Sequence, residues 1–232
     1  MTAAGAEQGT PPGRDATPVL ALRDVSRSFA GRPAVRPLSL GVPRERTTVL
    51  LGESGSGKST LLRLMAGLIA PDSGEILLEG TPVTLESGPA LRRPAEWRKQ
   101  RLEELGTVVR LAPDVLSRWP GELSGGQRQR VSLMRALFLR PSVVLLDEPL
   151  GALDPVTRGE LQQELIRVFR ELGSTVVLVT HDLEEAALLG DRVALLREGS
   201  LIQVGPMQEL AAQPADPWVS RFLAGWRGGS HP

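Results

Sequence analysis

Three groups of residues in this sequence suit phosphate and metal chemistry. The first is Gly52-Glu-Ser-Gly-Ser-Gly57-Lys58-Ser59, which matches the phosphate-loop pattern and lies between an apolar run and a helical pattern. Its glycines let backbone N–H groups converge on phosphate oxygens, with Lys58 bridging the outer phosphates and the Ser59 hydroxyl binding Mg²⁺. Lysine is rare here, since Lys58 and Lys99 are the only two. The predicted phosphate-loop residues are Gly52, Glu53, Ser54, Gly55, Ser56, Gly57, Lys58, Ser59 and Thr60.

The second group is a pair of acids, Asp147 and Glu148, directly after the apolar run Val143–Leu146. A buried strand would deliver Asp147 to the carboxyl edge of a sheet, beside the phosphate loop, where it can hold a metal's water shell. Glu148 is then placed to polarise an attacking water. Two solvated acids at a strand end would give the same pattern, and the phosphate loop upstream favours the functional interpretation.

The elements that must position these residues alternate along the chain between short apolar strands and longer helical patterns. Runs 48–51, 143–146 and 175–179 are each followed by a helical pattern, which indicates a largely parallel sheet. A stripe of apolar residues predicts a helix over 158–172, and Asp182 with Glu185 has the spacing of a capping box. Antiparallel pairs are predicted for Val193–Arg197 with Leu201–Val204, and for Val19–Val25 with Glu75–Leu78.

Composition excludes several functional classes. The chain has 232 residues, 27 basic against 27 acidic side chains, and no cysteine. Its apolar runs are far shorter than a membrane span requires, and its interspersed charges argue against nucleic-acid binding. Residues 1–18 are predicted to be a disordered tail without a signal-peptide core, so a cytoplasmic protein is expected.

The third group, Leu123-Ser-Gly-Gly-Gln127, precedes a helical run and lies upstream of Asp147. It resembles the signature motif of the ATP-binding-cassette (ABC) family. From Val19 to Phe222 the chain is similar to such a cassette, the ATPase subunit of a membrane transporter. This resemblance implies an α/β phosphate-loop NTPase fold of ABC type: a mixed, mostly parallel sheet flanked by helices, a small antiparallel lobe, and a shortened helical subdomain at about 91–140.

The resemblance also implies roles for single residues. ATP and Mg²⁺ are the expected cofactors, with Ser59 and Asp147 on the metal and Glu148 and His181 as catalytic residues. Phe29 lies where the family places an aromatic that stacks on adenine, although a core phenylalanine fits the pattern nearly as well. Asp154, in Gly151-Ala-Leu-Asp154, resembles the loop that links two nucleotide sites. The resemblance further implies that the signature residues cap the nucleotide held by a second subunit: Ser124, Gly125, Gly126 and Gln127. An ordinary helix cap is the alternative interpretation of these residues.

The chain departs from the family between Gly80 and the helical run 91–105. There the family carries a further strand, ending in a glutamine that reaches metal and water, and a loop that meets the membrane subunit. The segment is short by about a strand and a loop. Gln100 is flanked by charge rather than by an apolar strand, so it is assigned to a helix surface.

Two classes of function follow. The first is an ATP-hydrolysing subunit of an ABC importer, with a second cassette, permease subunits and, indirectly, a substrate-binding protein as partners, on the inner face of the cell membrane. The stretch from His181 to Phe222 is most similar to cassettes of osmolyte importers, for glycine betaine, choline or carnitine. The alternative is an ATP-dependent dimerisation or regulatory module with weak or no hydrolysis, or a decayed transporter cassette. An ABC-type ATPase acting on DNA or ribosomes fits less well, and residues 223–232 are expected to form a C-terminal tail.

Overall fold

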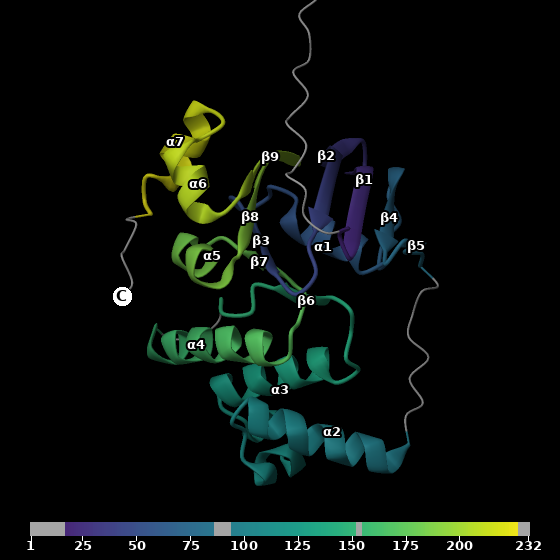
Figure 1. Ribbon diagram of the computed structural model, residues 1–232, viewed down its shortest axis with the longest axis vertical. Coiled ribbons are helices and arrows are strands. Elements are labelled where there is room, and N and C mark those ends of the chain that lie inside the picture. Colours follow the sequence, from purple (N-terminus) through teal and green to yellow (C-terminus); the bar gives the residue numbers. More distant parts are fainter. Residues whose placement is uncertain (1–16, 86–93, 152–154, 227–232) are drawn as a thin grey trace, which may run out of the picture.

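The computed structural model describes residues 17–85, 94–151 and 155–226. It contains two sheets and the helices that pack on them (Figure 1). The strands are β1 (Leu20–Phe29), β2 (Arg32–Val42), β3 (Thr47–Leu51), β4 (Ser73–Leu78), β5 (Thr81–Pro82), β6 (Val144–Asp147), β7 (Val176–Thr180), β8 (Arg192–Arg197) and β9 (Ser200–Gly205). The α-helices are α1 (Lys58–Met65), α2 (Ala95–Val108), α3 (Gly125–Leu137), α4 (Pro155–Glu171), α5 (Leu183–Leu189), α6 (Met207–Ala212) and α7 (Pro217–Leu223).

The core sheet has the strand order β6-β7-β3-β8-β9 and is parallel except for β9. Every residue of β3 and of β7 is buried, as expected for central strands covered on both faces. Because β3, β6 and β7 run in the same direction, their carboxyl ends meet at one edge of the sheet. The phosphate loop, the acid pair and His181 therefore follow neighbouring strands.

The smaller sheet is antiparallel, in the order β2-β1-β4-β5. The predicted β1–β4 and β8–β9 pairings are confirmed, and so is the mostly parallel sheet with a small antiparallel lobe. The long strand β2 was not predicted, because its apolar residues are interrupted by arginines, prolines and a glycine. Asp24 in β1 and Ala30 in the turn after it have positive φ, consistent with an irregular hairpin.

Two hydrophobic clusters cover the two faces of the core sheet. Alternate residues of β3 divide between them: Val49 and Leu51 face the cluster built with α3 to α7, whereas Leu50 faces the cluster built with α1 and the small sheet. The stripe predicted on α4 is buried, with Leu161, Leu165, Val168 and Phe169 all at most 6% exposed. Val168 alone is completely inaccessible.

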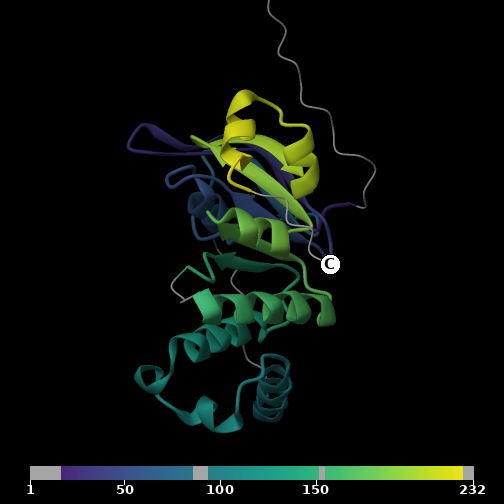
Figure 2. The same cartoon turned by 90° about the vertical axis from the view of Figure 1, so that its left-hand side faces the viewer.

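Helices α2 and α3, in teal, lie at the opposite end of the molecule from α6 and α7, in yellow (Figures 1 and 2). Arg101 joins α2 to α3 by donating to the carbonyl oxygens of Leu137 at 3.0 Å and Phe138 at 3.4 Å. The fold continues past Phe222, the predicted boundary, because Leu223 is only 4% exposed and Trp226 packs on the same cluster. No helix within the described ranges is both long and apolar enough to cross a bilayer.

Between β5 and α2 the structure describes no further strand in residues 83–85 and 94. The core sheet accordingly has five strands among the residues placed here, and β6 forms one of its edges. Gln100 is exposed on α2, as predicted. Among these residues, no strand pairs with the outer edge of β6, beside the two acids.

Candidate phosphate and metal site

The phosphate loop turns from the end of β3 into the first turn of α1. Gly57, the N-cap residue, has φ 99°, a conformation that favours glycine. A Cβ on this glycine would lie 2.3 Å from the carbonyl oxygen of Ala34 in β2, so a side chain here has no room. The Gly199 N–H, in the β8–β9 turn, donates to the Ser56 carbonyl at 3.1 Å. Both sheets therefore hold the loop in place.

Lys58 is buried under this loop, with 6% of its surface exposed. Its Nζ donates to the carbonyl oxygens of Gly52 and Glu53, both at 2.8 Å. Burial lowers the pKa of Lys58, and the nearby carboxylates of Glu148 and Asp147 oppose this shift. The ammonium is thus hydrogen-bonded to two carbonyl oxygens and lies close enough to both acids to interact with their charge.

Ser59 and Asp147 meet as predicted, across 88 positions of sequence. The Ser59 hydroxyl donates to Asp147 Oδ1 at 3.2 Å, and both side chains remain accessible to solvent. Hydroxyl and carboxylate oxygens are hard ligands, which Mg²⁺ prefers, and they commonly hold it together with waters and substrate phosphates. These two oxygen ligands therefore fit a magnesium ion beside the phosphate loop.

Glu148 and His181, both predicted as catalytic residues, lie next to each other. The His181 Nδ1 lies 3.3 Å from Glu148 Oε1, and the two side chains are 62% and 46% exposed. Glu148 has φ 44°, an uncommon backbone conformation for a residue other than glycine, and its N–H is held by the Val179 carbonyl at 3.0 Å. The two side chains are free to meet a water or a ligand at this edge of the sheet.

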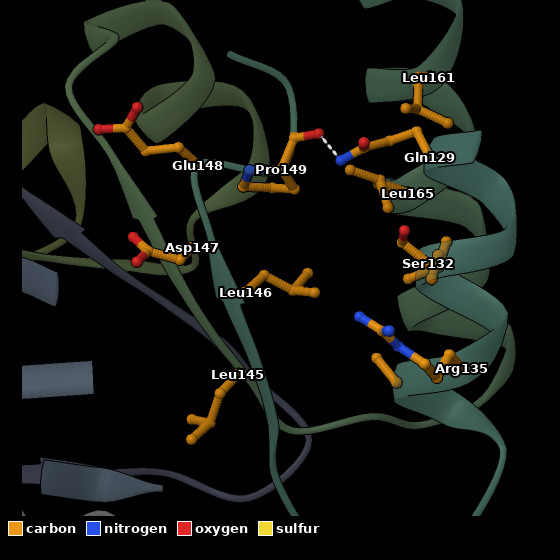
Figure 3. A pocket seen from close by; sticks show the side chains of 12 residues that line it. Gln129, Ser132, Arg135, Leu145, Leu146, Asp147, Glu148, Pro149, Leu161 and Leu165 are labelled. Atoms are coloured by element: carbon orange, nitrogen blue, oxygen red, sulfur yellow. Dashed lines mark hydrogen bonds between the residues drawn. The ribbon is translucent and has the colours of Figure 1, made fainter. Parts of the chain in front are cut away.

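Two further residues, neither of them predicted as a site residue, support the site. Gln129 on α3 donates from its side-chain amide to the carbonyl of Pro149, the residue after Glu148 (Figure 3). Nothing in the sequence marks Gln129 for this contact, because the two residues are brought together by the packing of α3 near β6.

The second is Glu185, which is 4% exposed. Asp182 caps α5 as predicted, accepting from the Glu184 and Glu185 N–H groups. The reciprocal half of the predicted capping box is wrong, because the Glu185 carboxylate accepts from Thr180 Oγ1 at 2.6 Å instead. Thr180 Oγ1 in turn accepts from the Asp182 N–H at 3.0 Å. Glu185 thus steadies the residues on both sides of His181, and its burial raises its pKa.

The remaining predicted residues lie away from this cluster. Ser124 is the N-cap of α3 and forms a capping box with Gln127: Gln127 N–H donates to Ser124 Oγ at 3.2 Å, and Ser124 N–H to Gln127 Oε1 at 2.9 Å. Among the described residues, no hydrogen bond connects the turn Ser124–Gln127 to the phosphate loop. Ser124 and Gly125 are exposed, so their outer face is open to a partner. Phe29 is 46% exposed at the end of β1, which excludes the core alternative, and Asp154 lies outside the described residues.

Comparison with known proteins places the chain in a family. A sequence model described as "ABC transporter" matches residues 35–110 and 93–151. The glycine betaine/carnitine/choline transport ATP-binding protein of Bacillus subtilis is 36% identical over 88% of this chain and 62% of its own length. The glycine betaine uptake system ATP-binding protein of Escherichia coli is 38% identical over 86% of this chain and 74% of its own length. Relatives of similar identity are named for import of Fe(3+) ions, spermidine/putrescine and sulfate/thiosulfate.

The chain spans 62% of the length of the first relatives. Within the aligned region it is also shorter than they are: 88% of 232 residues is about 204, so about 32 of the 236 aligned positions face gaps in this chain. A dimeric solved structure of a bacterial ABC transporter cassette matches with a TM-score of 0.69 and 27% identity, over 81% of this chain and 98% of that one. The fold of this chain and these matches show that it belongs to the ABC transporter family, as an ATP-binding cassette.

Proposed function

We propose that this chain is the ATP-binding and ATP-hydrolysing subunit that energises an ABC importer. The observation that carries the proposal is the meeting of two pairs at one sheet edge: Ser59 with Asp147 at 3.2 Å, and Glu148 with His181 at 3.3 Å. Lys58 lies under the same loop, and the negative charges of Glu148 and Asp147 favour its protonated form. A phosphate-binding cation, a metal-binding pair and a water-orienting acid are the parts that phosphoryl transfer to water requires.

In this mechanism the loop N–H groups from Gly52 to Ser59, with Thr60, hold the phosphates of ATP at the N-terminus of α1. Lys58 Nζ exchanges its bonds to the Gly52 and Glu53 carbonyls for phosphate oxygens, and so stabilises negative charge on the outer phosphates. Ser59 and Asp147 would hold Mg²⁺, which neutralises phosphate charge when it is bound. Glu148 accepts a hydrogen bond from the attacking water and orients it, and His181 steadies the γ-phosphate.

A matched pair of lysine variants tests this assignment. Lys58→Ala should abolish ATP turnover by the purified chain in the presence of Mg²⁺, because the buried ammonium and its charge are lost. Lys99→Ala is the control, since Lys99 is exposed on α2. Turnover that survives in the Lys58 variant would remove the central residue from the mechanism.

The partners in this proposal are a second copy of the chain and the permease subunits of a transporter at the inner face of the membrane, with a substrate-binding protein acting indirectly. The matched solved structure is described as dimeric, and the turn Ser124–Gln127 is open to a second subunit's nucleotide. In a mixed dimer, Ser124→Arg in one chain should disable the nucleotide held by the other chain. Loss confined to the mutant chain's own nucleotide would contradict a role across the interface.

We further propose an osmolyte such as glycine betaine or choline as the transported substance. The support is that the first two relatives are named for transport of glycine betaine, carnitine and choline. Uptake of labelled glycine betaine by vesicles containing the chain and its permease, compared with Fe(3+), spermidine and sulfate, tests this step. Uptake of one of the other three alone would assign the chain to a different importer.

One observation favours a second function, an ATP-dependent dimerisation module with little or no hydrolysis. The carboxyl edge described here holds no glutamine side chain that reaches Ser59 or Asp147, and the sheet ends at β6. If this function holds, the chain dimerises on ATP in gel filtration but releases no phosphate. Steady phosphate release by the parent chain excludes it.

A further inference from the structure

Strand β6 has one free edge. Within the residues that the structure places, it pairs with β7 alone. The N–H groups of Val144 and Glu148 donate to β7, to the carbonyls of Thr175 at 2.8 Å and Val179 at 3.0 Å. Because backbone groups in a parallel pair alternate in direction along a strand, those of Leu145 and Asp147 point the other way. These groups offer hydrogen bonds that a further strand would satisfy.

A cavity of about 540 Å³ lies beside this edge. Its walls come from β6 on one side and from α3 and α4 on the other, and Figure 3 shows Ser132 and Arg135 on the α3 side of it. Leucines line much of it: Leu133, Leu145, Leu146, Leu161 and Leu165. Leu145 and Leu146 are half-buried, whereas every residue of β7 next to them is buried. The exposed apolar surface is therefore the part of the sheet that lacks a neighbour.

The charges along the cavity differ between its two ends. Figure 3 shows Arg135 on α3 toward the amino end of β6, and Asp147 and Glu148 toward its carboxyl end. Arg135 is exposed and has no hydrogen bond or ion pair among the residues described. A strand parallel to β6 would therefore be favoured by an acid near its start and by an uncharged or cationic residue near its end.

The shape of the cavity argues for one strand rather than for the edge of a second sheet. Helix α3 stands across from β6 (Figure 3), so a second copy's β6 would have to enter with its own helices attached. The first two relatives carry about 32 aligned positions for which this chain has no residues, so this chain is shorter than they are within the aligned region. Among the described residues, the unpaired edge of β6 and the exposed, unpaired charge of Arg135 favour an extended segment supplied by another molecule.

We propose that the groove between β6 and α3 binds an extended segment of another polypeptide, which adds to the free edge of β6 as a sixth, parallel strand. The segment is mostly apolar over at least five residues, begins with an acid opposite Arg135 and ends without a negative charge. Main-chain hydrogen bonds to Leu145 and Asp147 supply affinity, and the leucine pockets supply selectivity. Binding does not depend on ATP hydrolysis, so this proposal can fail while the proposed function holds, and the reverse.

The probe is a fluorescent acetylated peptide, DVTVIVQ-amide, together with a panel in which valine, isoleucine and leucine are exchanged at the apolar positions. Anisotropy with the full chain should show saturable binding. Two N-methylated forms provide the sharpest control, because methylation removes N–H donors from alternate residues. Methylation of the residues facing β6 should abolish binding, whereas methylation of the other set should leave it intact.

Protein variants test the place of binding. Ser132→Trp fills the groove from the exposed face of α3 and should raise the Kd of the probe at least about tenfold, a change of ~1.4 kcal/mol. Ser220→Trp, at an exposed position of α7, is the matched control and should leave the Kd unchanged. Arg135→Glu should weaken DVTVIVQ and favour the peptide KVTVIVQ, which reverses the charge at the same end.

Amide hydrogen exchange of the segment 143–149 decides between the remaining outcomes. In the free chain Leu145 and Asp147 should exchange faster than the residues of β7, and the probe should slow them. Slow exchange without any peptide would overturn the proposal, because the edge would already be covered by this chain or by a second copy. Fast exchange that no peptide of the panel slows, or binding that Ser132→Trp does not affect, would overturn it as well.

Discussion

The ion pair between Arg130 and Glu164 joins the helix that follows the signature turn to α4. Arg130 Nε donates to Glu164 Oε2 at 2.8 Å, and the two side chains are 27% and 6% exposed. The other oxygen, Glu164 Oε1, is buried without a hydrogen-bond partner among the described residues. Glu164 therefore depends on one arginine for compensation of a buried charge.

Arg130→Met should lower the free energy of unfolding by about 3 kcal/mol, the lower end of the range for breaking a buried pair, because Arg130 retains some solvent. The double variant Arg130→Met with Glu164→Leu should recover most of this loss, since no uncompensated carboxylate remains and the two side chains pack together. A double-mutant cycle from urea unfolding at pH 7 measures the coupling, expected to exceed ~1 kcal/mol. Glu171→Leu is a control, because its partner Arg167 and Glu171 itself are both partly exposed, and should cost under about 1 kcal/mol.

Additive losses in the cycle would refute this reasoning, because they would mean that Glu164 is no better compensated by Arg130 than by water. A second readout separates packing from function. The phosphate loop lies between β3 and α1, away from the Arg130–Glu164 pair. If the pair acts only on the position of α3 and the signature turn, the double variant should therefore keep the ATP affinity of the parent chain.

Three further outcomes follow from the site. Burial raises the pKa of Glu185 in the folded chain above its value in the unfolded chain. The stability that this group contributes is therefore complete below the unfolded pKa and is lost as pH rises through the folded pKa. In urea titrations, Glu185→Gln should accordingly gain stability relative to the parent between pH 4 and pH 7. Equal differences at both pH values would contradict this. Gly57→Ala should destabilise the chain by more than the ~1–2 kcal/mol of left-handed strain, because its Cβ would meet the Ala34 carbonyl. Gly55→Ala is the control and should cost the strain alone, since no atom lies within 4 Å of its Cβ. Equal urea midpoints for the two variants would rule out the contact. Gln129→Leu should lower the kcat for ATP about fivefold with little change in KM, because the Pro149 carbonyl loses a hydrogen bond worth ~1 kcal/mol. An unchanged kcat would show that Gln129 does not position Glu148.

The local parts of the fold and site were predictable from the sequence because their signals are local. A glycine-rich loop before Lys58, an apolar run before Asp147 and a strand before His181 each specify their own end of a strand, and parallel strands bring those ends together. Strand β2 was harder to predict, since its apolar positions are broken by arginines and prolines and its pairing with β1 supplies the regularity. The contacts of Gln129 and Glu185 depend on which helix packs where, and no spacing in the sequence carries that information.

The missing strand shows the same division. The resemblance to ABC cassettes predicts that a segment is absent before the helical subdomain, because no apolar run occupies that place here. That the absence leaves a lined groove beside β6, with a cation at one end and two acids at the other, depends on the positions of α3 and α4. The groove is therefore a property of the tertiary structure alone.

The central claim is that Glu148, at the end of β6, orients the water that attacks ATP. The most direct test is phosphate release by Glu148→Gln, measured beside ATP binding by the same variant. The amide keeps the size of the side chain and removes its charge, so turnover should fall by at least about 100-fold while ATP binding persists. Turnover equal to that of the parent chain would contradict the claim, because hydrolysis would then come from another group or from a contaminating enzyme.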